Sequence, residues 1–273
     1  MVLSPIYALP ACDAITQYLL RLGDSSLMLG HRLSEWAGHA PTLEEDIALA
    51  NVGLDHIGAA RLLLAEAGSR MKPALSEDDL AYWREPAAWR GFTACELPNS
   101  GIATGHNRGQ HARDFGFTSV RNALYAAYSA LLWEQLSSSG DAALAGIAAK
   151  CVKEARYHYV HASGWVQRLG GGTPQSQVRA QAALNALWPY CTEWFTEDAV
   201  TQESHAAGFA PLHARLRARW DDIIDALLVQ SELKRPATTA FVSQGAQGLH
   251  SEHLGFLLAE MQSVARAHPG ATW

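Results

Sequence analysis

The feature of this chain that most limits its fold is a recurrence of apolar residues with the period of an α-helix. Near the N-terminus the large apolar side chains include Leu19, Leu22, Leu29, Leu33 and Trp36, with a spacing close to 3.6 residues. Alanine and leucine dominate the sequence, and runs of the β-branched residues that strands favour are almost absent. The sequence therefore predicts an all-α protein.

The same periodicity divides the chain into seven predicted helices within a single domain, residues 1–273. They are expected at residues 14–37, 42–68, 118–137, 141–169, 174–195, 211–230 and 251–267. Thr42 and Glu45 have the spacing of a capping box at the start of the second helix. Two long helices, a long crossover and two more long helices form the topology of a ferritin-like four-helix bundle, here followed by additional C-terminal helices.

The crossover, residues 71–116, is rich in proline and glycine and predicts only one short helix, near residues 77–83. Trp83, Trp89 and Phe92 lie within it. Because such large apolar side chains need a surface to cover, we expect an ordered segment that wraps the bundle.

Charge and composition exclude several classes of protein. The formal net charge is −6, with no basic stripe of the kind that nucleic-acid binding requires. No charged n-region opens the chain, and no run of about 18 uncharged apolar residues occurs, so we expect neither a signal peptide nor a membrane span. The four cysteines lack Cys-x-x-Cys spacing and are read as reduced thiols. We expect a cytoplasmic protein.

Bundles of this topology raise the question of a di-iron site, which takes a Glu from each of two helices and a Glu-x-x-His from each of the other two. Neither Glu-x-x-His nor Asp-x-x-His occurs in the chain. His56 has Gly53 where the carboxylate should stand, and Glu154 has Tyr157 where the histidine should stand. We therefore predict no catalytic, cofactor-binding or metal-binding residue in this chain.

Four residues remain as candidates for a vestigial site: Glu35, Asp55, Glu154 and His158. The alternative interpretation is that they are ordinary polar residues on amphipathic helices. If carboxylates do remain from a lost site, an inward-turned Lys150 or Lys153 could neutralise them, a hypothesis that fails if both lysines face solvent.

Two further histidines, His250 and His253, stand three residues apart. Zinc or iron binding is one interpretation. The other is a helix N-terminus with Glu252 in its first turn, where a negative charge is favourable.

Several long motifs carry a resemblance to a known family. They lie at residues 18–24, 31–41, 43–51, 153–158, 248–255 and 258–262. Together they resemble the C subunits of bacterial phenylacetyl-CoA epoxidases, also called phenylacetate-CoA oxygenases, and the likeness extends over about residues 18–273.

The resemblance implies a structural, non-catalytic subunit. In such complexes a related A subunit carries the di-iron centre, a small B subunit bridges assemblies, and a reductase with flavin and an iron–sulfur cluster brings electrons from NADPH. The implied reaction inserts one oxygen atom of O₂ into the ring of phenylacetyl-CoA, a step of aerobic phenylacetate catabolism. The implied partners are the A subunit by direct contact, the B subunit and the reductase, and we expect the first two helices, over residues 36–57, to supply much of the contact.

Two other functions stay open at this point. The first is a di-iron oxygenase with atypical ligands drawn from the four candidate residues. The second is a stand-alone helical protein that binds an acyl-CoA, with Arg121, Arg156 and Arg168 converging on the phosphates. Iron content would separate the first from a structural subunit, and co-purification with a catalytic chain would separate the second.

Overall fold

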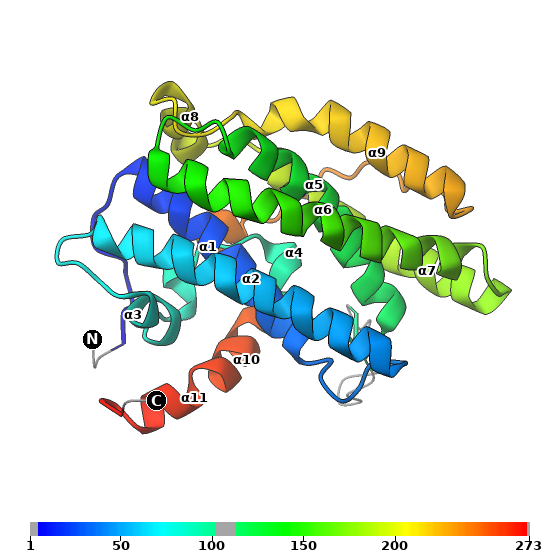
Figure 1. Ribbon diagram of the computed structural model, residues 1–273, viewed down its shortest axis with the longest axis horizontal. Helices are drawn as coiled ribbons and strands as arrows, with labels where there is room; N and C mark the ends of the chain where they lie inside the picture. The colour runs from blue at the N-terminus through cyan, green and yellow to red at the C-terminus, as the bar shows by residue number, and fades with distance from the viewer. Residues whose placement is uncertain (1–4, 102–112, 272–273) are drawn as a thin grey trace.

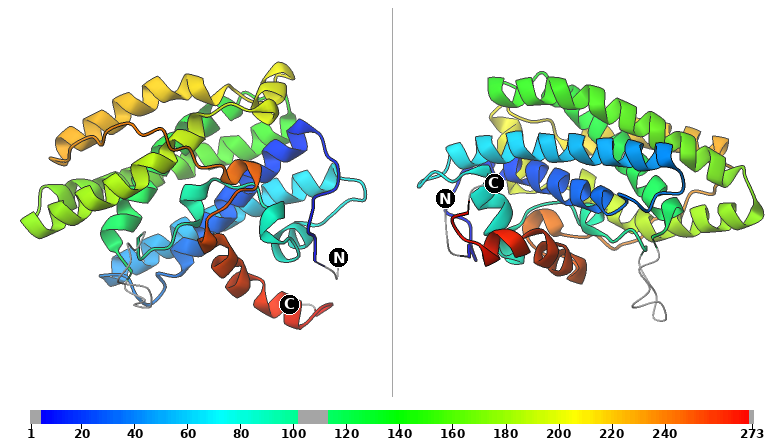
Figure 2. Two further views of the ribbon diagram at one scale, coloured as in Figure 1. Left: turned by 180° about the vertical axis from the view of Figure 1, so that it is seen from behind. Right: turned by 60° about the horizontal axis from the view of Figure 1, so that its bottom comes forward.

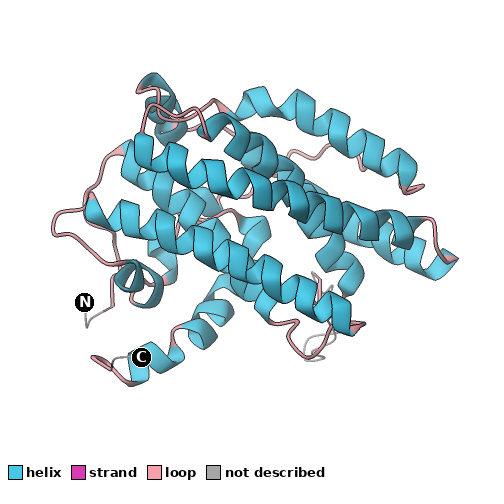
Figure 3. Ribbon diagram, in the orientation of Figure 1, coloured by secondary structure: helices cyan, strands magenta, loops and turns pink. Residues whose placement is uncertain are grey.

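Four long helices form the body of the molecule in the computed structural model, which describes residues 5–101 and 113–271 (Figure 1). They are α1 (Ala14–Ser34), α2 (Leu43–Ser69), α5 (Phe115–Leu136) and α6 (Ala142–Gly170). α1 packs along α2, α5 packs along α6, and α2 lies beside α6. No strand occurs in the described residues, as Figure 3 shows. The prediction of an all-α, ferritin-like bundle is confirmed.

Local capping explains why these helices begin where the sequence predicts. The side chains of Asp13, Thr42, Asp114 and Asp141 each accept a hydrogen bond from a backbone N–H in the first turn of their helix. The capping box predicted at Thr42 is only half formed, because the Glu45 carboxylate turns away to contact a histidine on α6.

Glycines allow α1 and α2 to pack unusually closely. A Cβ added at Gly30 would lie 2.8 Å from Ile57 Cγ1, and one added at Gly53 would lie 3.3 Å from the Gly30 carbonyl oxygen. A Cβ at Gly23 would lie 2.9 Å from a methyl group of Leu64. Most of α1 is buried, including polar residues such as Arg21, Asp24 and Ser25.

The crossover is ordered in its described part and contains three short elements rather than one. These are α3 (Glu77–Tyr82), the 3₁₀ turn η1 (Pro86–Ala88) and α4 (Thr93–Glu96). Trp83, Trp89 and Phe92 are buried, as expected of an ordered wrap. A fully buried ion pair anchors the segment: the Arg84 guanidinium donates to both carboxylate oxygens of Asp24 on α1.

The C-terminal part contains more, and shorter, elements than the three helices predicted. They are α7 (Pro174–Leu187), η2 (Trp188–Phe195), α8 (Ala199–Ala206), η3 (His213–Leu216), α9 (Arg217–Gln230), η4 (Gly245–Gln247), α10 (Glu252–Met261) and α11 (Ser263–Ala267). The predicted helix over 174–195 tightens into a 3₁₀ segment at Trp188–Pro189, because proline removes a backbone donor. As Figure 2 shows, α7 and α9 cover the α5–α6 side, while α10 and α11 extend from the α1 side.

One helix in the described residues, α2, is long and apolar enough to cross a membrane by length and composition alone. It packs lengthwise on α1 and carries Asp55 and His56 at its middle. Its outward face nevertheless exposes Leu43, Ile47 and Leu54. The expectation concerned an uncharged run of about 18 apolar residues, and α2 is interrupted by charged residues such as Asp55 and Arg61.

Candidate functional site between α2 and α6

Two histidines face each other where α2 meets α6. The ring centroids of His56 and His158 lie 5.0 Å apart. Both rings line a small cavity of about 20 Å³, together with Tyr125, Cys151 and other side chains of the four long helices. A volume of this size has room for about one water molecule, so the site is a small polar centre rather than a substrate pocket.

Two carboxylate–imidazole pairs join the helices at this centre. Asp55 Oδ2 lies 3.0 Å from His158 Nε2, and Glu45 Oε2 lies 2.9 Å from His161 Nε2. His158 and His161 are three residues apart and so share one face of α6. The pairs satisfy polar groups in the contact between α2 and α6, which is the plainest role for them.

Burial dominates the protonation of the two facing rings. It lowers the pKa of His56 well below its usual value, and the nearby His158 and Arg121 lower it further. Burial also lowers the pKa of His158, although the hydrogen bond to Asp55 opposes the shift. Both imidazoles are therefore neutral at pH 7.

The two facing histidines show where a Glu-x-x-His motif would have to lie on α2 and α6. The residues three positions before His56 and His158 are Gly53 and Ala155, so neither histidine has the carboxylate of a Glu-x-x-His. Beside Gly53 the backbone of α1 fills the space, with Gly30 O 3.3 Å from the position of a Cβ. The residues present do not fit a di-iron centre. Within residues 5–101 and 113–271, no group of three or more His, Cys, Asp or Glu side chains is placed to hold a metal ion.

Three of the four vestigial-site candidates converge here. Asp55, Glu154 and His158 all line the cavity. Burial and the Asp55 charge raise the pKa of Glu154. Lys150 contacts Glu154 at 3.5 Å, but its side chain is 56% exposed and Lys153 is exposed too. The hypothesis of an inward-turned ammonium is therefore wrong.

Glu35, the fourth candidate, belongs to a different polar cluster. Its carboxylate accepts hydrogen bonds from Arg32 at 2.6 Å and from the Asn99 amide at 2.9 Å. Asn99 in turn accepts from Arg121 and Thr118 of α5. Glu35 thus ties the end of the crossover to α1, away from the α2–α6 centre.

The three arginines proposed to bind an acyl-CoA do not converge. Arg121 is buried, and its guanidinium donates to the Leu97 carbonyl and to Asn99. Arg156 pairs with Glu134 on the surface, and Arg168 lies over the Trp165 ring. The acyl-CoA interpretation loses the feature on which it depended.

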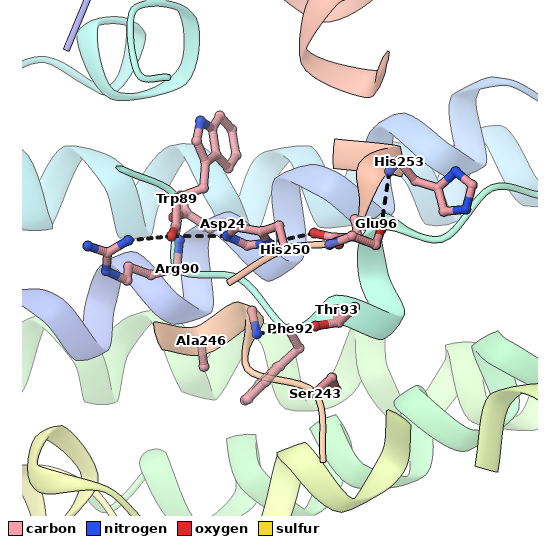
Figure 4. A network of polar contacts seen from close by, with 12 residues as sticks. Asp24, Trp89, Arg90, Phe92, Thr93, Glu96, Ser243, Ala246, His250 and His253 are labelled. Atoms are coloured by element: carbon pink, nitrogen blue, oxygen red, sulfur yellow. Dashed lines mark hydrogen bonds and ion pairs between the residues drawn. The ribbon is translucent and has the colours of Figure 1, made fainter. Parts of the chain in front are cut away.

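His250 and His253 have separate surroundings. His250 Nδ1 lies 2.6 Å from Glu96 Oε2, and its Nε2 lies 3.1 Å from the Trp89 carbonyl oxygen (Figure 4). Ser251 caps α10, and Glu252 stands in the first turn of that helix. The helix N-terminus interpretation is the one that this geometry matches.

Sequence reasoning missed the contacts of Glu45 with His161 and of Asp55 with His158. The one regular spacing is on α6, where His158 and His161 are three residues apart and share a face, whereas Glu45 and Asp55 are ten residues apart on α2. Pairing the two faces, however, requires knowing how α2 and α6 pack.

Comparison with known proteins identifies relatives of the chain. A model of the family described as phenylacetic acid catabolic protein matches residues 8–273. The C subunit of the 1,2-phenylacetyl-CoA epoxidase of Escherichia coli (strain K12) is 39% identical over 261 residues, which span 96% of this chain and 100% of that relative. The resemblance in the motifs is confirmed, and the chain belongs to the phenylacetic acid catabolic protein family.

Proposed function

We propose that this chain is the structural C-type subunit of a phenylacetyl-CoA 1,2-epoxidase and carries no reaction step itself. The reaction, insertion of one oxygen atom of O₂ into the aromatic ring, takes place on the related A subunit. The similarity to the C subunit of an epoxidase over 96% of the chain supports the assignment of the complex.

The close contact of α1 with α2 at Gly53 is the observation that carries the non-catalytic role. A carboxylate at this position would be needed to complete a Glu-x-x-His with His56. The position instead holds a glycine, and the Gly30 carbonyl oxygen occupies the space beside it. The side chains that remain satisfy one another, and the cavity they enclose is too small for an aromatic substrate.

An exposed apolar surface on the two central helices supplies a place for the catalytic subunit to dock. We call it the α2–α6 face and define it by Leu43, Ile47, Leu54, Tyr157 and Val160, which are 54–71% exposed. Exposed apolar groups gathered on adjacent helices are typical of protein interfaces. Of the first two helices, α1 is mostly buried within the chain and α2 presents an exposed face, so we propose that α2 supplies the contact expected over residues 36–57.

The remaining partners and cofactors follow from the same proposal. The B subunit and the reductase complete the complex, and no nucleic acid or membrane takes part. The di-iron centre belongs to the A subunit, and flavin, the iron–sulfur cluster and NADPH belong to the reductase. We place the complex in the cytoplasm.

Co-purification tests the docking surface. The chain is expressed with its catalytic subunit, and Leu54→Asp is compared with Val229→Asp, a matched change at an exposed valine on α9. We expect the Leu54 variant to lose most of the bound partner, because a charge at the centre of an apolar interface is costly to bury. Equal recovery of the partner by both variants would move the interface elsewhere.

A further inference from the structure

A hydrogen-bonded tyrosine–histidine pair lies in the core, apart from the α2–α6 centre. The Tyr18 hydroxyl on α1 is 2.7 Å from His213 Nε2 in η3. His213 Nδ1 lies 3.1 Å from the Trp194 carbonyl oxygen and 2.9 Å from the Tyr128 hydroxyl. Tyr18, Tyr128 and His213 are at most 1% exposed, so the pair is shielded from water.

The direction of the hydrogen bonds follows from the acceptors. A carbonyl oxygen only accepts, so His213 Nδ1 carries the proton and donates it to Trp194. In the neutral ring Nε2 is then an acceptor, and the Tyr18 O–H donates to it. Burial lowers the pKa of His213 to about 4, which keeps the ring neutral at pH 7 and leaves Nε2 with a free lone pair.

Two nearby carboxylates stabilise a positive charge on His213. The Glu197 and Asp198 carboxylates both favour the protonated ring, while Arg21 opposes it. Glu197 Oε2 is buried and has no hydrogen-bond partner among residues 5–101 and 113–271. Burial also raises the pKa of Tyr18, which disfavours a phenolate, so the phenol retains its proton until an electron leaves it.

Aromatic rings connect the pair with the α2–α6 face. The ring of Tyr128 lies 6.0 Å from His213 and 6.1 Å from Tyr125 by centroids. The run continues from Tyr125 to His56 at 6.3 Å and then to His158. Its last step, from His158 to Tyr157, is 6.3 Å, and Tyr157 is 56% exposed.

We propose that Tyr18 and His213 form a proton-coupled redox pair that takes up oxidising equivalents arriving at the α2–α6 face. Tyr157 is oxidised first and releases its hydroxyl proton to solvent. An electron then tunnels from Tyr18 past Tyr128, Tyr125 and the two imidazoles to Tyr157, which takes a proton back from solvent. Tyr18 loses one electron while its hydroxyl proton moves to His213 Nε2, so the O–H bond breaks and an N–H bond forms. The products are a neutral tyrosyl radical and an imidazolium that the Glu197 charge stabilises.

The cycle closes when a thiol-class reductant at the surface gives up one electron and leaves as a thiyl radical, with its proton released to solvent. Tyr18 regains the electron, and His213 returns its proton to Tyr18. This inference rests on the proposed function only for the source of the oxidant, an oxygen-activating metal centre in the docked subunit. Transfer of one oxidising equivalent from such a centre to Tyr18 would protect the centre when it reacts with O₂ in the absence of its aromatic substrate.

Flash photolysis tests the pair on the full-length chain without its partner. The oxidant is photogenerated tris(bipyridine)ruthenium(III), with persulfate as the electron acceptor, and radicals are detected by freeze-quench electron paramagnetic resonance. We expect a tyrosyl radical whose spectrum reports a hydrogen bond, and which Tyr18→Phe removes. Tyr7→Phe, a matched change at a 72% exposed tyrosine, should leave it intact.

His213→Gln keeps a polar group but removes the base, so the radical should form about 100-fold more slowly, the scale of a positioned proton acceptor. The wild-type chain in D₂O adds a test that needs no substitution, because transfer along the hydrogen bond should slow the step. An unchanged radical in Tyr18→Phe, or the absence of a solvent isotope effect, would overturn the redox pair.

The protective role is tested separately, in the reconstituted complex supplied with O₂ and NADPH but no aromatic substrate. Complexes with Tyr18→Phe should lose activity faster than those with Tyr7→Phe, and equal rates would overturn protection. Failure of the chain to bind a catalytic subunit at all would instead contradict the proposed function and leave the photochemical result standing.

Discussion

At the scale of single residues, His250 illustrates how a buried charge can hold two distant segments together. Both of its ring nitrogens face acceptors, Glu96 Oε2 and the Trp89 carbonyl oxygen, so both carry protons and the ring is an imidazolium. Ser251 N donates to the other Glu96 oxygen. These contacts fasten the start of α10 to α4, as Figure 4 shows.

The stability of this contact should depend on pH in a defined direction. Burial alone would lower the pKa of His250, but the hydrogen bond and charge of Glu96 raise it above its usual value. Because the pKa of His250 is raised in the folded state, its contact with Glu96 stabilises the protein fully at pH values below the unfolded-state pKa of about 6.5. This stabilisation is lost as the pH rises through the folded-state pKa.

We therefore expect His250→Gln to lower the free energy of unfolding by about 3 kcal/mol at pH 6, the scale of a broken buried ion pair, and by less at pH 9. Denaturant titrations at the two pH values measure this difference. His253→Gln is the control, since burial lowers the pKa of that half-buried histidine instead. A deficit for His250→Gln that grows with pH would contradict the assignment.

At the scale of elements, the approach of α1 to α2 decides what the centre of the bundle can hold. Glycines at 30 and 53 bring the two backbones close together, and this leaves no space for a longer side chain at either position. Gly53 is also where a ligand carboxylate would stand before His56. The same contact therefore explains both the tight packing and the lack of a complete ligand set.

Glycine-to-alanine substitutions separate packing from helix propensity. In Gly30→Ala the new methyl group meets Ile57 Cγ1 at 2.8 Å, so we expect a loss of about 1–3 kcal/mol from overpacking. In Gly146→Ala, on the exposed side of α6, the new methyl group has no neighbour within 4 Å in the described residues beyond its own stretch of helix. There we expect a gain of about 0.5–1 kcal/mol from helix propensity. Thermal unfolding of both variants measures this contrast, and equal effects would rule out the close contact.

At the scale of the whole molecule, the bundle presents an apolar face and encloses a polar centre whose residues do not complete a di-iron ligand set. A chain that lacks both carboxylates of the ligand motif should not retain iron. We expect well under one iron per chain after anaerobic Fe(II) loading and desalting, measured by elemental analysis. The complex with the catalytic subunit, treated identically, is the control and should retain iron. About two irons in the isolated chain would establish it as an oxygenase and revive Asp55, Glu154 and His158 as ligands.

Much of the fold could be predicted from the sequence because the signals are local. Caps such as Asp13 and Thr42, and the helical spacing of leucines, act within one or two turns. The eight-residue helix α8 escaped prediction because it is too short to show a period. The 3₁₀ segment η2 escaped because the helical spacing of apolar residues was followed past Pro189, where the missing backbone donor ends the α-helix.

The sequence by itself determined that the chain is helical, that it lacks a Glu-x-x-His and that it resembles one chain of an epoxidase complex. Only the tertiary structure decided that Asp55, Glu154 and His158 line one cavity while Glu35 pairs with Arg32. It also decided that His213 accepts a hydrogen bond from the Tyr18 hydroxyl. The physical reason is that spacing along a helix fixes which residues share a face. Which faces meet depends on packing between helices distant in the chain, here on the glycine contact of α1 with α2.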